Sequence, residues 1–94
     1  MIIVMGWLRV DPEERAAYLA GCRAVIEAAR AAPGCGEFHL SADPIQEDRI
    51  NVVERWASVG DVEAFRGSGP SDDQQSSILD AEVVQYEVTD ALDL

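Results

Sequence analysis

A strand predicted over residues 49–56 constrains the fold most, because it combines a strongly apolar face with one carboxylate. The segment is rich in β-branched and aromatic residues, and successive side chains of a strand point to opposite faces. One face therefore carries Ile50, Val52, Glu54 and Trp56. A buried carboxylate without a partner destabilises the fold. Glu54 must either hold a backbone amide or an arginine such as Arg9 or Arg66, which we prefer, or act as a proton acceptor with a raised pKa.

A short helix is predicted directly after this strand. Ser58 can accept hydrogen bonds from the free N–H groups of a first helical turn, and Asp61 suits the positive end of the helix dipole. The buried residues of this helix should be Val59, Val62 and Phe65.

A long helix is predicted between the first two strands. The sequence Asp11-Pro12-Glu13-Glu14 indicates its start, with Asp11 as the N-cap. The helix should run to about residue 32, because Pro33-Gly34 ends it. Its apolar stripe consists of Leu19, Cys22, Ile26 and Ala29, flanked by Tyr18 and Val25.

Three other segments have strand patterns. Residues 2–10 are apolar on both faces, which is typical of a central strand, and residues 35–43 and 82–88 alternate. The residues Ser71-Asp72-Asp73-Gln74 can cap one more short helix that reaches Leu79.

The order β-α-β-β-α-β predicts a ferredoxin-like α+β fold, in which two helices cover one face of a four-stranded antiparallel sheet. One domain should span residues 1–94. The second face should carry the more polar sets of strands two to four around an apolar centre from strand one. Such a face is typical of a sheet that packs on a second copy, so a homodimer is predicted.

The composition excludes several classes of partner. The chain has 18 acidic and 7 basic residues, a net charge of −11, which argues against binding to nucleic acid or to an anionic membrane surface. The first ten residues lack the basic region of a signal peptide and are too short to cross a bilayer. We expect a cytoplasmic protein in which Cys22 and Cys35 are reduced and structural.

Two motifs resemble signatures of the antibiotic biosynthesis monooxygenase (ABM) domains, small dimeric α+β barrels related to the quinol monooxygenases. They are Pro33-Gly34-Cys35 leading to Phe38 and Asp43, and Glu54-Arg55-Trp56-Ala57-Ser58 followed by Val62-Glu63-Ala64. The resemblance implies a ferredoxin-like fold that dimerises through its sheets and has a cavity between sheet and helices. It also implies oxidation of phenolic or quinol substrates by dioxygen without a metal or a flavin.

The chain departs from this family at two positions. Phe65 stands where many members have a histidine, and Val52 stands where some cofactor-free members have an asparagine. Asn51 is one residue away and therefore on the opposite strand face. The haem-degrading relatives use a helix tryptophan, where this chain has Phe65, and a downstream histidine, which is lacking after residue 39. Haem cleavage is not expected.

The candidate site residues each have a structural alternative. Glu54 and Tyr18 are candidates for proton transfer and for hydrogen bonding to a ligand. The candidates for substrate contact are Trp56, Phe65, Trp7 and Val52, although large aromatic residues in a small domain are more often core residues. His39, beside Glu37, is either a general base or, as we prefer, a partly exposed strand residue near the dimer seam. No metal or cofactor site is predicted.

Three functions are compatible with these patterns. The first is a cofactor-independent monooxygenase acting on a small aromatic, quinol or polyketide-like substrate. The second is a non-catalytic dimeric ligand-binding or accessory domain. The third is an isomerase or cyclase, for which Glu54 is the strongest acid–base candidate. Motifs for nucleophilic hydrolysis, phosphate binding and dinucleotide binding are absent from the sequence.

Overall fold

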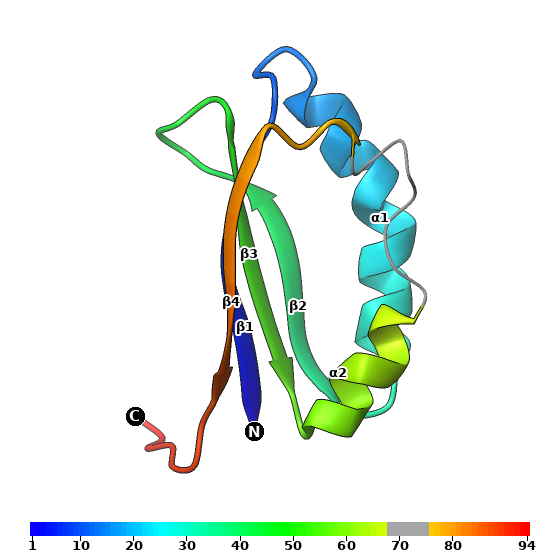
Figure 1. The fold of residues 1–94 in the computed structure, drawn as a ribbon, viewed down its shortest axis with the longest axis vertical. Coiled ribbons are helices and arrows are strands. Elements are labelled where there is room, and N and C mark those ends of the chain that lie inside the picture. The colour runs from blue at the N-terminus through cyan, green and yellow to red at the C-terminus, as the bar shows by residue number, and fades with distance from the viewer. Residues whose placement is uncertain (68–75) are drawn as a thin grey trace.

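The computed structural model describes residues 1–67 and 76–94 as two helices and four strands around one sheet. The elements in chain order are β1 (Ile2–Arg9), α1 (Arg15–Ala31), β2 (Cys35–Ala42), β3 (Arg49–Trp56), α2 (Val59–Arg66) and β4 (Asp80–Glu87). The sheet is antiparallel with the order β2-β3-β1-β4, and both helices lie on the same side of it (Figure 1). The predicted ferredoxin-like α+β fold is confirmed. The short helix predicted from residue 71 lies largely outside the described residues.

The start of α1 differs from the prediction. The Asp11 carboxylate accepts a hydrogen bond from the Glu13 amide at 2.9 Å, and residues 12–14 form a turn. The helix begins only at Arg15, and its N-cap residue, Glu14, makes no side-chain cap. The Arg15 guanidinium donates to three backbone carbonyl oxygens of the segment between β2 and β3, those of Asp43, Gln46 and Arg49. These bonds fix the start of α1 against the connection between β2 and β3, at the same end of the sheet (Figure 1).

The end of α1 follows the Pro33-Gly34 prediction. Ala32 is extended, with φ −73° and ψ 146°, because a residue before proline avoids helical angles. Gly34 has a φ of +81°, and a Cβ atom there would lie 2.1 Å from an oxygen of Asp61. Glycine is required at this turn, which brings the chain close to the first turn of α2.

The core lies where α2 and α1 meet the sheet. Its buried residues are Ile2, Val4, Ala29, Phe38, Trp56 and Val62. The Phe65 ring packs against both aromatic members, with centroid distances of 5.3 Å to Trp56 and 5.7 Å to Phe38. Trp56 is the largest fully buried side chain.

The predicted faces of β3 and the cap of α2 are confirmed. Ile50, Val52 and Trp56 are buried toward the helices, and the Ser58 hydroxyl accepts a hydrogen bond from the Asp61 amide at 3.2 Å. Val59 was expected to be buried and is 39% exposed. It occupies the first position of α2, where its side chain lies outside the helix–sheet contact.

The second face of the sheet is more apolar than predicted, because β4 presents the opposite side chains. Val84 and Tyr86 are paired with Met5 and Ile3 of β1, so they share the face that carries no helix. Met5 is also paired with Val53 of β3. The members of this apolar row, Met5, Val53, Val84 and Tyr86, are each 40–48% exposed in the single chain. We call this surface the open face.

Replacement of Trp56 by alanine should lower the free energy of unfolding by ~3–5 kcal/mol, because a large buried aromatic side chain is cut to a methyl group. Denaturant melts at one protein concentration measure the change. Ile45→Ala is the control, since Ile45 is 87% exposed and its replacement should change stability by less than ~0.5 kcal/mol. A loss below ~1 kcal/mol for Trp56→Ala would contradict the assigned core.

Candidate functional site

A cavity of about 950 Å³ lies between the helix-covered face of the sheet and the two helices. Residues from both helices and all four strands line it, and most of them are apolar. The larger apolar side chains in its wall include Leu8, Val25, Phe38, Leu40, Val52 and Phe65. Its volume is in the range of sites that take a small organic molecule. The polar side chains in this wall therefore define the chemistry that the cavity offers.

Glu54 of β3 and Asp61 of α2 are the acidic side chains among the described residues that line the cavity. The Oε1 atom of Glu54 accepts a hydrogen bond from the indole Nε1 of Trp56 at 2.9 Å. Burial raises the pKa of Glu54, while the Trp56 hydrogen bond and the charge of Arg66 lower it in part. The hydrogen-bond partner is thus an indole two residues along the same strand face, in place of the backbone amide, Arg9 or Arg66 that the sequence suggested. Of these, Arg66 still acts on Glu54 through its charge.

Tyr18 and Cys22 lie one helical turn apart on α1 and both line the cavity. Burial, with a smaller contribution from a hydrogen bond to Cys22, raises the pKa of Tyr18 to about 12. Tyr18 therefore remains a neutral phenol near neutral pH and can donate a hydrogen bond. Burial also raises the pKa of the Cys22 thiol, which disfavours the reactive thiolate.

Arg66 and Gln85 form a polar pair at the cavity that the sequence analysis did not identify as a site. The Arg66 guanidinium, at the end of α2, donates a hydrogen bond to Oε1 of Gln85 on β4 at 2.8 Å. Arg66 itself lines the cavity. Its charge also acts on the pKa of Glu54, so the carboxylate and the guanidinium belong to one polar region.

The sequence-predicted contact residues occupy three different environments. Val52 and Phe65 are in the cavity wall. Trp56 is fully buried behind the wall, where its ring packs on Phe65 and its N–H group holds Glu54. Trp56 can therefore affect a ligand through Glu54 and Phe65 rather than through direct stacking.

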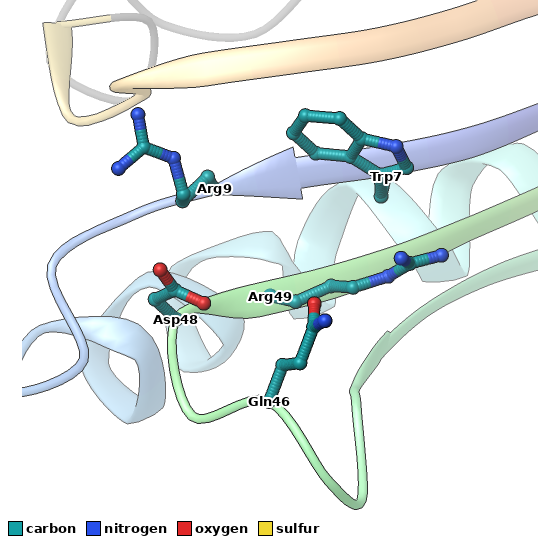
Figure 2. Close-up of a pocket in the computed structure, with 5 residues that line it drawn as sticks. All are labelled: Trp7, Arg9, Gln46, Asp48 and Arg49. Atoms are coloured by element: carbon teal, nitrogen blue, oxygen red, sulfur yellow. The ribbon is translucent and has the colours of Figure 1, made fainter.

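Trp7 lies apart from the other candidates, on the open face. Figure 2 shows it beside Arg49, at a second and smaller hollow of about 510 Å³ that Arg9, Gln46 and Asp48 complete. The Arg49 guanidinium is 5.9 Å from the centroid of the Trp7 ring. A ligand in the cavity between sheet and helices cannot reach Trp7, because the sheet separates them.

His39 is also remote from the cavity. Its Nε2 atom lies 2.5 Å from a Glu37 carboxylate oxygen, and its Nδ1 atom lies 3.2 Å from Arg30 Nη2. The hydrogen bond with His39 lowers the pKa of Glu37. Glu37 lies on the edge strand β2 and Arg30 on α1. His39 is exposed, as expected for a strand residue without a catalytic role.

The sequence matches the family model of the antibiotic biosynthesis monooxygenases over residues 1–75. The chain belongs to the ABM family. No curated protein matches the sequence. The family resemblance that the Pro33-Gly34-Cys35 and Glu54-to-Ser58 motifs suggested is therefore confirmed.

Solved structures similar to this ABM protein share its fold over nearly the whole chain. PA3566 from Pseudomonas aeruginosa has a TM-score of 0.80 at 17% identity, with 94% of each chain covered. A candidate antibiotic biosynthesis monooxygenase from Deinococcus radiodurans has a TM-score of 0.79 at 20% identity, covering 100% of this chain and 98% of its own. Rv0793 from Mycobacterium tuberculosis has a TM-score of 0.78 at 21% identity, with 98% of each chain covered.

Two absences in the described part of this ABM chain concern metal ions and membranes. Among residues 1–67 and 76–94, no three or more histidine, cysteine or acidic side chains are grouped so that they could hold a metal ion. Within the same residues, neither helix has the length and apolar character needed to span a membrane. Neither Cys22 nor Cys35 forms a disulfide bond.

Glu54→Gln should make the ABM protein more stable relative to wild type as the pH rises. The pKa of Glu54 is higher in the folded chain than in the unfolded one, so the wild type loses stability as the carboxyl ionises above its unfolded pKa. Glutamine cannot ionise and can still accept from Trp56. Thermal melts of both proteins from pH 4 to pH 8 should show the difference in melting temperature moving in favour of Glu54→Gln. A difference that stays constant, or moves the other way, would contradict the burial of this carboxylate.

Proposed function

We propose that this ABM protein is a cofactor-independent monooxygenase that oxidises a small, electron-rich hydroxyaromatic or quinol in the cavity. The observation that carries the proposal is the position of Glu54, a carboxylate with a raised pKa in a mostly apolar cavity. A base of this kind is suited to take a proton from a phenol or an enol. Family membership supports the oxidation chemistry.

The reaction needs no reductant other than the substrate. In an anthrone-type compound, a methylene group between two aromatic rings becomes a carbonyl group, which removes four electrons from carbon. Dioxygen accepts these four electrons, so one oxygen atom becomes the carbonyl oxygen and the other leaves as water. A hydroquinone that becomes a hydroxyquinone gives the same balance. The protein must therefore position the substrate and move its protons.

The cavity residues can divide these tasks. Glu54 accepts the proton whose loss makes the substrate an electron-rich anion, and the Trp56 N–H group holds the carboxylate in one orientation. Tyr18, which stays protonated because of its pKa of about 12, donates a hydrogen bond to a substrate oxygen. The apolar wall, including Phe65 and Val52, places the aromatic ring and excludes water.

A non-catalytic ligand-binding or accessory domain is the alternative. The observation that favours it is the presence of Phe65 and Val52 where the resemblance places a histidine and an asparagine. An isomerase or cyclase that uses Glu54 as its acid–base group would occupy the same cavity.

Metal-free protein should consume oxygen in the presence of an anthrone or a dihydroxynaphthalene, and the rate should fall about 100-fold in Glu54→Gln, because the base is lost while the shape is kept. An oxygen electrode measures the rate, and mass spectrometry with labelled dioxygen should find one labelled atom in the product. Glu63→Gln is the control, since this substitution removes the same charge from an exposed position on α2.

Two results would count against this function. Binding of these compounds without oxygen uptake above the uncatalysed rate would support the accessory domain instead. A Glu54→Gln rate equal to the wild-type rate would exclude Glu54 as the base.

We also propose that the protein is a homodimer formed through the open face. The exposed apolar row across β3, β1 and β4 has Met5 at its centre, and a second copy would cover it. The ABM family supports this assembly, since its members are typically dimeric.

Light scattering at micromolar concentration should give twice the mass of the 10.2 kDa chain. Met5→Asp should shift the protein toward the monomer, because a carboxylate would be buried in the middle of the contact. Ile45→Asp should remain dimeric, since Ile45 lies in the exposed segment between β2 and β3. A wild-type monomer would contradict the proposal.

A further inference from the structure

The charges in the cavity wall are unevenly placed. Among the described residues that line it, Glu54 and Asp61 are acidic and Arg66 is the one cation. The whole chain has a net charge of −11, so its overall field repels anions. A guanidinium in the wall of this mostly apolar cavity is therefore a local exception to the negative charge of the protein.

The Arg66 side chain is exposed to solvent and reaches from α2 to β4. Its Nη1 atom donates to Gln85 Oε1 at 2.8 Å, and this contact joins the end of α2 to β4. Gln85 shares the helix-covered face of β4 with Val83, which lines the cavity. The pair thus holds the guanidinium at the β4 side of the cavity. A guanidinium has five N–H donors, so one bond to Gln85 leaves others for a ligand.

Glu54 provides the complementary group. Its Oε1 atom is bonded to Trp56, and no hydrogen bond from the described residues reaches its Oε2 atom. Oε2 can accept from a ligand hydroxyl. Glu54 and Arg66 line the same cavity, so one small aromatic molecule with its hydroxyl at Glu54 can also contact the guanidinium.

We propose that the substrate is a hydroxyaromatic molecule that also carries an anionic group such as a carboxylate, which Arg66 binds. Gln85 is the positioning residue that orients the guanidinium. This inference rests on the proposed function, since it assigns the substrate class of the same cavity. A guanidinium binds a carboxylate through paired, charge-assisted hydrogen bonds.

The test compares an uncharged hydroxyaromatic ligand with ligands of the same ring system that also carry a carboxylate. Isothermal titration calorimetry would measure the Kd of 2-naphthol and of a series of hydroxy-2-naphthoates with the hydroxyl at different ring positions. In the wild type, the best hydroxynaphthoate should bind about tenfold more tightly than 2-naphthol, as one charge-assisted pair allows. Arg66→Gln should abolish this gain, so that the hydroxynaphthoate and 2-naphthol bind this variant with about the same Kd.

Two further variants separate a local effect from a general one. Arg23→Gln is the matched control, because it removes the same charge from an exposed position on α1, where Arg23 pairs with Glu27. It should keep the full preference for the carboxylate. Gln85→Ala should reduce the preference for the carboxylate severalfold without changing the Kd of 2-naphthol. A general loss of structure would raise the Kd of 2-naphthol as well.

The outcomes that overturn the proposal are distinct from failure of the enzyme. If 2-naphthol binds and no hydroxynaphthoate binds more tightly, or if Arg66→Gln keeps the gain, Arg66 does not bind an anionic group, whatever the oxygen uptake shows. If oxygen uptake fails but the carboxylate preference is present and lost in Arg66→Gln, the cavity binds such ligands without oxidising them. If neither ligand binds, the proposal for Arg66 is wrong, and oxygen uptake alone decides the proposed function.

Discussion

The hydrogen bond from the Trp56 indole to the Glu54 carboxylate is the interaction on which the rest of the structure depends. Trp56 is fully buried and its ring packs on Phe65, so it belongs to the core. Its N–H group also holds the one acid of β3 that faces the cavity. The same residue therefore supports the sheet and orients the candidate base. A change in the packing of Trp56 should therefore also change the orientation of the Glu54 carboxylate.

The two faces of the sheet have different roles: one carries the core and the cavity, and the other is the open face. On the helix-covered face, the residues near α2 form the core, and the remaining space forms the cavity. On the open face, the Met5 row leaves apolar surface that 94 residues cannot cover alone. A cavity leaves part of the core of a small chain unfilled. Burial of the open face against a second copy would compensate for the stability that the cavity lowers. The proposed dimer and the proposed site are in this sense linked.

Local patterns in the sequence predicted the elements and most of their faces, whereas tertiary contacts decided the exceptions. The alternation in β3 and the Ser58 cap are local signals and are confirmed. The start of α1 was misplaced because Asp11 bonds to Glu13 in a turn. The facing of β4 was reversed because both of its side-chain sets contain valines, and pairing with β1 selects between them.

Parts of the candidate site could likewise be predicted and parts could not. The carboxylate of Glu54 stood out because an acid on an apolar strand face needs a partner. Its partner could have been found, since Trp56 lies two residues away on the same face. The contact between Arg66 and Gln85 could not be predicted, because the two residues are 19 positions apart in the sequence and belong to different elements. Trp7 was grouped with the cavity because both faces of β1 are mostly apolar, so alternation alone does not show which face the helices cover.

A carbon-13 NMR titration of the Glu54 carboxyl group tests most directly whether the cavity holds a desolvated carboxylate under the control of Trp56. The account predicts a pKa above the ordinary glutamate value of about 4.3, because burial is the largest influence on it. Trp56→Phe should raise the pKa further, since it removes the N–H donor that stabilises the ionised form while keeping an aromatic core residue. A Glu54 pKa at or below the ordinary value, or one that does not change in Trp56→Phe, would contradict it.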